Sequence, residues 1–229
     1  MLVLALDTAT PQVGVAIGDD GALRGEVRLL GGRRHAEQLA PAIDFLCRQT
    51  RVELRHVAVV AVGVGPGLFT GLRVGVTTAK VMAQALRIPV VAVPSLDLIA
   101  YPLRSSARRI AVVVDARRHE VFTARYQPVP GGVQRVSDYT VGPADEVVAD
   151  LAADREDVLL AGDGVEANRG AFAALGRAEV AGPLFEAPSV AALVELATGR
   201  FEREEFDSPF EVRPLYLRAS DAELAWDAR

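Results

Sequence analysis

A carboxylate and two hydroxyl groups lie close together in the turn that follows the first predicted strand: Asp7, Thr8 and Thr10. An aspartate in such a turn can hold a magnesium ion through water, while the hydroxyl groups approach a phosphate. The same residue types are also typical of an Asx turn, in which the side chains bond their own backbone. Taken alone, the segment Asp7-Thr8-Ala9-Thr10 favours the turn over the magnesium site.

A glycine-rich segment, Gly63-x-Gly65-Pro66-Gly67, follows a predicted buried strand and precedes a predicted helix. Glycines let backbone amides point at an anion, and a helix N-terminus adds partial positive charge, so the geometry suits a phosphate. The segment is not a P-loop, because Gly71-Leu72-Arg73 stands where Gly-Lys-Ser/Thr is required, and it lacks the third glycine of a dinucleotide fingerprint. The remaining interpretation is a tight turn that lets the helix pack closely on the sheet.

Small side chains recur every four residues along the helix predicted over residues 69–86, and an apolar stripe overlaps them. Such a face permits close approach of another helix. It can lie inside its own domain or against another chain, and both interpretations stay open. A second amphipathic helix over residues 35–49 is the natural second wall. Together the two helices give nine candidate partner-interface residues: Leu39, Ile43, Leu46, Gly71, Leu72, Gly75, Val76, Ala79 and Ala83.

Metal-dependent and hydrolytic chemistry finds little support in the sequence. His35, His56 and His119 are the only histidines, and no two of them have the spacing of metal ligands on one helix. Cys47 lies beside Leu46 in the first predicted helix, which favours a small core residue over a nucleophile. No Gly-x-Ser-x-Gly elbow is present. We therefore predict no metal site.

The composition indicates a folded globular protein. The chain has 229 residues, a net charge of −5 and 50% hydrophobic residues, and its single cysteine cannot form an internal disulfide. No apolar run is long enough to span a bilayer and no leader precedes the first strand, so we expect a cytoplasmic protein without membrane contact. Residues 1–109 carry 13 basic and 8 acidic side chains, whereas residues 110–229 carry 12 and 22. This asymmetry predicts two regions with different surfaces.

Hydrophobic periodicity predicts two α/β halves that both open with antiparallel strands and continue into alternating helices and strands. We expect domains over residues 1–104 and 105–204, with a tail, about residues 205–229, that packs back on the first. Ser95 is predicted to cap a short helix over residues 95–101. The predicted strands cover residues 1–6, 13–17, 22–29, 57–62, 89–93, 110–114, 120–126, 133–139 and 158–161. Further helices are expected over residues 145–153, 166–175 and 189–200.

Four motifs together resemble the bacterial TsaB (YeaZ-like) family over essentially the whole chain. They are Asp7-Thr8-Ala9-Thr10, the segment Gly65-Pro66-Gly67-Leu68-Phe69-Thr70-Gly71-Leu72-Arg73, Asp115-Ala116-Arg117, and Pro214-Leu215-Tyr216-Leu217-Arg218. The resemblance implies the actin-like ATPase and sugar kinase (ASKHA, ribonuclease H-like) fold, with two related α/β domains facing a cleft. In that fold Asp7, Thr8 and Thr10 would serve phosphate and magnesium, and Gly162 and Gly164 would serve adenosine.

The resemblance also implies a noncatalytic role. TsaB is similar to TsaD, the subunit that transfers a threonylcarbamoyl group to the adenosine beside the anticodon of tRNAs reading codons that begin with A. TsaD-like chains carry a His-x-x-x-His metal motif where this chain has Ser95 and Ile99, and neither residue replaces an imidazole. Asp115-Ala116-Arg117 stands where TsaD-like chains have a glycine-rich phosphate turn, and its carboxylate would repel a phosphate. We therefore expect no intrinsic transferase or protease activity.

The implied partners are TsaD, bound through the helices of the first domain, and the ATPase TsaE, with a homodimer forming when TsaD is absent. Contact with tRNA is expected mainly through TsaD. No intrinsic cofactor is expected, and ATP or ADP would enter only in the assembled complex. One alternative is a nucleotide-dependent phosphotransferase of the same fold that uses Asp7. A glycoprotease is disfavoured by the missing metal ligands.

Overall fold

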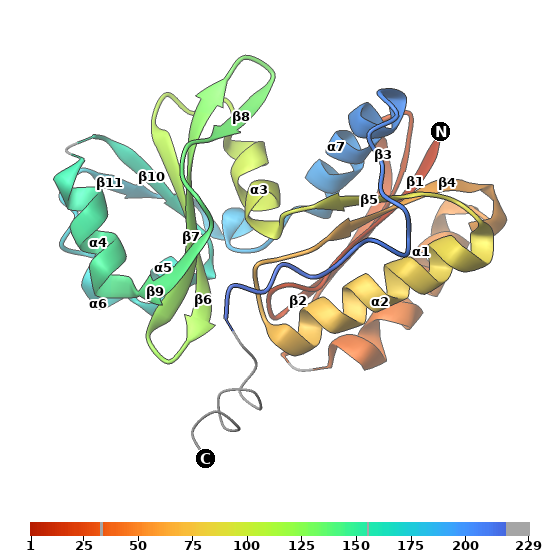
Figure 1. Cartoon of the computed structure of the whole chain (residues 1–229), viewed down its shortest axis with the longest axis horizontal. Helices are drawn as coiled ribbons and strands as arrows, with labels where there is room; N and C mark the ends of the chain where they lie inside the picture. The colour runs from red at the N-terminus through yellow and green to blue at the C-terminus, as the bar shows by residue number, and fades with distance from the viewer. Residues whose placement is uncertain (33, 155, 219–229) are drawn as a thin grey trace.

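The computed structural model describes residues 1–32, 34–154 and 156–218 and contains two α/β domains, each built on one mixed sheet (Figure 1). In the first sheet the strand order is β3-β2-β1-β4-β5. β1, β2 and β3 are antiparallel neighbours, and β4 and β5 continue the sheet parallel to β1. The strands are β1 (Leu2–Asp7), β2 (Gln12–Asp19), β3 (Ala22–Leu30), β4 (Val57–Gly63) and β5 (Val90–Val93).

The second sheet repeats this plan. Its order is β11-β10-β6-β7-β8, in which β7 is antiparallel to β6, and β10 and β11 are parallel to β6. β9 pairs with the first residues of β7, Glu120–Thr123. The repeated order is the duplicated fold predicted above. The strands are β6 (Arg109–Arg117), β7 (Glu120–Val129), β8 (Gly132–Arg135), β9 (Thr140–Pro143), β10 (Val158–Ala161) and β11 (Ala178–Val180).

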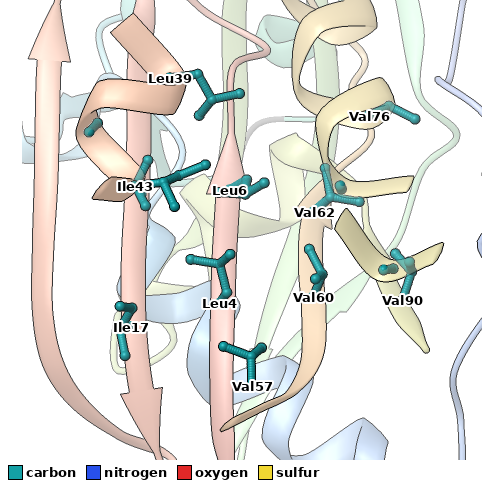
Figure 2. Packing of buried hydrophobic residues seen from close by; sticks show 14 of the residues in the cluster. Leu4, Leu6, Ile17, Leu39, Ile43, Val57, Val60, Val62, Val76 and Val90 are labelled. Atoms are coloured by element: carbon teal, nitrogen blue, oxygen red, sulfur yellow. The ribbon is translucent and has the colours of Figure 1, made fainter. Parts of the chain in front are cut away.

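Helices cover both faces of the first sheet. α1 (His35–Thr50) and α2 (Phe69–Leu86) share one face, and α7 (Val190–Glu202) covers the other. The side chains of β1 alternate accordingly, because successive residues of a strand point to opposite faces. Leu4 and Leu6 pack toward α1 and α2, as Figure 2 shows, whereas Val3 and Ala5 pack toward α7.

Shorter helices connect the strands and cover the second sheet. α3 (Ser95–Ala100) follows β5 and joins the two domains, and α4 (Ala144–Ala153) lies on the second sheet (Figure 1). Residues 166–175 were predicted as one helix, but the structure has two. The break falls at Asn168, whose side-chain amide donates to the Gly164 carbonyl at 3.0 Å and so competes with regular helix. The remaining helices are α5 (Asp163–Ala167), α6 (Arg169–Phe172) and the 3₁₀ turns Leu54–His56, Tyr101–Leu103 and Pro183–Phe185.

The predicted extent of the second domain needs correction, because α7 falls within residues 105–204 yet packs on the first sheet. Its buried side chains Val190 and Val194 lie against β2. They occupy the space that side chains at Gly14 and Gly18 would otherwise take. The chain therefore returns to the first domain about 15 residues before the predicted tail.

The described part of the predicted tail continues along the first domain. Asp207 pairs with Val90 at the edge of β5, and Val212 is buried in the core beneath α1 and α2. Residues 219–229 of the predicted tail lie outside the described residues.

Candidate functional site

The carboxylate of Asp7 is bonded inside the protein on both oxygens. Asp7 ends β1, where its Oδ1 accepts a hydrogen bond from the Ala9 amide at 2.9 Å and its Oδ2 accepts one from the Ser95 hydroxyl at 2.7 Å. The side chain is 1% exposed, and burial raises its pKa from 3.8 to about 6, although both hydrogen bonds lower it. The turn is thus an Asx turn whose carboxylate is also hydrogen-bonded by the Ser95 hydroxyl, and the carboxylate does not face solvent.

Thr8 and Thr10 also direct their hydroxyl groups into the protein. The Thr8 hydroxyl donates to the Gly71 carbonyl at 2.7 Å, and the Thr10 hydroxyl accepts from the Gln12 amide at 3.4 Å. Both residues are buried. The Nε2 atom of His35 lies at hydrogen-bond distance, 2.8 Å, from the Thr10 carbonyl oxygen. The magnesium and phosphate roles considered for Asp7, Thr8 and Thr10 would therefore require this turn to open, because all three side chains point inward.

The prediction that Ser95 caps a helix is wrong, because Pro94 holds the cap position and Ser95 begins α3. The Ser95 hydroxyl accepts from the Gly65 amide at 3.0 Å while donating to Asp7, and the Ser95 amide donates to the Gly65 carbonyl at 2.7 Å. A parallel-sheet argument could have found it, because Asp7 ends β1 and Ser95 follows β5 at the same edge of the sheet.

The glycine-rich loop after β4 is closely packed rather than open to an anion. A Cβ atom on Gly63 would overlap the Asp7 carboxylate, and one on Gly67 would overlap the Ala9 backbone. Gly65 has a φ of +100° and bonds Ser95 through both its amide and its carbonyl. This loop is therefore the tight turn left as the second interpretation.

The second-domain glycines also serve packing. Gly162 (φ +105°) and Gly164 lie so close to β6 that a Cβ on either would overlap the Val113–Asp115 backbone. Between them, the Asp163 carboxylate accepts from the Asp115 amide at 3.0 Å. Burial, with the charges of Asp115 and Glu186 adding to it, raises the pKa of Asp163 to about 6. The expected adenosine side of the cleft thus presents acidic groups next to its glycines.

The nine candidate interface residues belong to the core of the first domain, which corrects their predicted outward position. Leu39, Ile43 and Leu46 are between 2% and 5% exposed. Cβ atoms on Gly71 and Gly75 would overlap Thr8, so the small residues bring α2 against the β1–β2 turn of the same chain. The others are buried as well: Leu72, Val76, Ala79 and Ala83.

The opposite faces of the same two helices are exposed and carry both charged side chains, such as Asp44 and Arg73, and uncharged ones. On α1, Pro41 and Phe45 lie one turn apart in solvent, and Phe45 is 49% exposed. On α2, Thr77 and Val81 have the same spacing, and Val81 is 58% exposed. α1 and α2 contact each other on one face of the sheet (Figure 1). We call these four exposed, uncharged residues the outer helix face: Pro41, Phe45, Thr77 and Val81.

A pocket of about 430 Å³ lies between the domains, lined among others by Asp97, Arg135, Glu195 and Arg203. Its acidic groups are already bonded by the protein. Asp97 accepts from the Tyr126 and Tyr139 hydroxyls, and Glu195 accepts from the Tyr101 hydroxyl and Arg104. The pocket wall is thus built from interdomain hydrogen bonds, and Asp97 joins α3 to the second sheet.

The described ranges contain neither a cluster of metal ligands nor a membrane-spanning helix. Within residues 1–32, 34–154 and 156–218, no three His, Cys, Asp or Glu side chains gather as a metal site would require. Ile99 is buried in the second-domain core, and Cys47 is half-buried with its thiol pKa raised, chiefly by desolvation. No helix in these ranges is both long and apolar enough to cross a membrane.

Comparison with known proteins supports the fold and shows the family. Residues 28–226 match the family model described as TsaD: tRNA N6-adenosine threonylcarbamoyltransferase. The chain is 32% identical to the tRNA threonylcarbamoyladenosine biosynthesis protein TsaB of Bacillus subtilis, over 99% of this chain and 98% of that protein. The crystal structure of YeaZ from Pseudomonas aeruginosa superimposes with a TM-score of 0.81 at 30% identity, covering 94% and 99% of the two chains.

A more distant neighbour shares the fold alone. The activator of 2-hydroxyisocaproyl-CoA dehydratase from Clostridium difficile, solved with ADPNP bound, gives a TM-score of 0.52 at 12% identity over 94% of this chain and all of that one. The predicted actin-like ATPase and sugar kinase fold is therefore confirmed. With an identity above 30% to TsaB over nearly the full length of both chains, this chain belongs to the TsaB (YeaZ-like) family.

Proposed function

We propose that this chain is a noncatalytic subunit of tRNA threonylcarbamoyladenosine biosynthesis and acts by binding TsaD. The observation that carries the proposal is the state of Asp7. Its two carboxylate oxygens are taken by Ser95 and the Ala9 amide in a buried turn, so no free carboxylate is offered to a magnesium ion. A phosphotransferase of this fold that relied on Asp7 would need the carboxylate in the cleft.

The second domain offers a poor environment for a phosphate. Asp115 and Asp163 lie beside Gly162 and Gly164, and the Asp115 side chain bonds Arg117 both as an ion pair at 2.9 Å and through the Arg117 amide. Carboxylates in this position repel a phosphate rather than attract it. We therefore expect no cofactor bound by this chain alone, and ATP or ADP only in the assembly with TsaD and TsaE.

The outer helix face is the surface that suits TsaD. The TsaD family model matches this chain over most of its length, which supports an equivalent pair of helices in TsaD. Two related chains can pack through equivalent helix faces in a pseudo-twofold arrangement, and the same face allows a homodimer when TsaD is absent. A net charge of −5 argues against strong tRNA binding by the isolated chain, so tRNA is expected to bind mainly through TsaD.

Reconstitution of the modification reaction tests this role. Purified TsaD, TsaE, the threonylcarbamoyl-adenylate synthase and tRNA are assayed with and without this chain. Formation of modified tRNA only when the chain is present supports the proposal, whereas equal modification without it contradicts it. A titration with magnesium and ATP separates the phosphotransferase alternative, because such an enzyme binds nucleotide on its own and loses binding in the Asp7→Asn variant.

A further inference from the structure

The segment Val212–Arg218 leaves the first domain and ends on the second. It is anchored in the first domain by Val212, which is buried in the core, and by Lys80, whose Nζ donates to the Val212 carbonyl at 3.0 Å. The Leu215 amide then donates to the Val64 carbonyl at 2.7 Å, so the segment runs beside the glycine-rich loop. Figure 1 shows this stretch passing from the first sheet toward β6 and β7.

Tyr216 fastens the segment to the first turn of α2. The centroid of its ring lies 5.0 Å from that of the Phe69 ring. The Arg73 guanidinium carbon lies 4.0 Å from the centroid of the Phe69 ring, and Arg73 Nε donates to the Tyr216 hydroxyl at 3.2 Å. Two motifs far apart in sequence, Phe69-Thr70-Gly71-Leu72-Arg73 and Pro214-Leu215-Tyr216-Leu217-Arg218, thus form one contact.

The last two residues of the segment belong to the second domain. Leu217 packs against the apolar cluster of β6 and β7, and the Arg218 guanidinium pairs with the Glu120 carboxylate at the start of β7 at 2.5 Å. Both side chains of this ion pair are about one-third exposed or less, which strengthens it relative to a fully exposed pair. Residues 212–218 therefore contact both domains within seven residues.

A second tie joins the domains through α3. Ser95 at its start bonds Asp7 of the first domain, and Asp97 one half-turn later accepts from Tyr126 and Tyr139 of the second. The chain returns to the first domain just before α7, where the Ser189 amide donates to the Leu98 carbonyl of α3 at 3.2 Å, so this crossing lies beside α3. Connections grouped at one place leave a hinge about which two domains can rotate, as in closure around a ligand. The terminal segment adds a separate connection, from α2 to β7, that opposes this rotation.

We infer that residues 212–218 are an interdomain strap that holds the two domains at one fixed angle. The Tyr216–Phe69–Arg73 contact fixes the strap to α2, and the Arg218–Glu120 ion pair fixes it to β7. The domains of this chain then form one rigid body rather than a cleft that opens and closes. Breaking either end of the strap releases the angle while leaving each domain folded.

A distance measurement between the domains tests the strap. Spin labels are placed at exposed positions of α2 and α4 through Gln84→Cys and Ala149→Cys in a Cys47→Ser background, and pulsed EPR gives the distribution of distances. Arg218→Glu and Glu120→Arg alone are each expected to broaden the distribution, because like charges then meet. The double variant restores the ion pair in reverse and is expected to restore the narrow distribution.

A second pair of variants covers the other end of the strap. Tyr216→Ala removes the ring from Phe69 and is expected to broaden the distribution, whereas Tyr216→Phe keeps the ring, loses only the hydrogen bond to Arg73 and is expected to stay narrow. Far-UV circular dichroism checks that every variant folds. Unchanged distance distributions in Arg218→Glu, Glu120→Arg and Tyr216→Ala would overturn the strap. If the double charge variant gave a distance distribution as broad as those of the single variants, the ion pair would not be the contact that fixes the strap to the second domain.

Discussion

The hydroxyl of Ser95 donates a 2.7 Å hydrogen bond to the Asp7 carboxylate. From the resemblance, we expected Ser95 at the position of a metal-ligand histidine and Asp7 at the position of a magnesium-side carboxylate. In this chain the two positions bond each other in a buried contact at the carboxyl ends of β1 and β5. The Asp7–Ser95 pair therefore stabilises the fold of the first domain.

Replacing Asp7 by asparagine should change how stability depends on pH. The pKa of Asp7 is about 6 in the folded protein and near 3.8 when unfolded, so the folded state holds the proton more tightly. Its contribution to stability is therefore fully present below pH 3.8 and is lost as pH rises through 6, and the difference corresponds to roughly 3 kcal/mol. We expect the free energy of unfolding of the wild type, minus that of Asp7→Asn, to fall between pH 4 and 6 and then level off.

Urea unfolding at closely spaced pH values measures this difference, and Asp44→Asn on the exposed side of α1 is the matched control. A difference between the wild type and Asp7→Asn that stays flat from pH 4 to 7 would show that Asp7 does not titrate in this range.

Removing the Ser95 hydroxyl should destabilise the first domain. Ser95→Ala leaves Asp7 Oδ2 and the Gly65 amide without their partner in a buried site, which costs about 1–3 kcal/mol. The loss of a donor to the carboxylate should also raise the pKa of Asp7 further. Chemical denaturation checks the stability, with Ser106→Ala, which removes one hydrogen bond near the surface, as control. Equal effects of the two substitutions would contradict the buried role of Ser95.

A bulky residue at Gly75 should unfold the protein rather than merely block a partner. The position faces Thr8 inside the first domain, and a side chain there would overlap the Thr8 hydroxyl. Overpacking of this kind typically costs about 1–3 kcal/mol. We expect Gly75→Leu to lower the melting temperature strongly and Gln84→Leu, on the exposed side of the same helix, to change it little. A fully stable Gly75→Leu monomer that no longer binds TsaD would restore the original interface assignment.

Local periodicity was enough to predict most strands and the main helices, because strands such as β4 and helices such as α2 carry their pattern within a few residues. It missed the short strands β9 and β11, and the strand predicted over residues 133–139 ends at Arg135. It was not enough to assign the faces of α2. The spacing of Gly71 and Gly75 reports close packing but does not tell whether the neighbour is the same chain, and here the neighbour is Thr8, more than 60 residues earlier.

Long-range placement explains the other differences. The apolar pattern of α7 does not specify which sheet it covers, and the answer depends on the space left by Gly14 and Gly18 of β2. Ser95 reads as a helix cap from its neighbours alone, because its partners Asp7 and Gly65 are brought to it only by the order of strands β1, β4 and β5. The pairing of Tyr216 with Phe69 has no local signal for the same reason.

A charge on the outer helix face should disrupt binding to TsaD. Val81 belongs to that face and is 58% exposed, so Val81→Asp would place a carboxylate in the proposed contact, where binding removes it from water. Val180 in β11 of the second domain is the matched control, since it is the same residue type and 60% exposed. We expect Val81→Asp to weaken binding to TsaD at least tenfold, or about 1.4 kcal/mol, in a calorimetric titration, and Val180→Asp to leave it unchanged.

Both substitutions lie on exposed positions and should leave the melting temperature within a few degrees. Equal affinities for the two variants would place the TsaD contact elsewhere on the chain, and a loss confined to Val180→Asp would move it to the second domain.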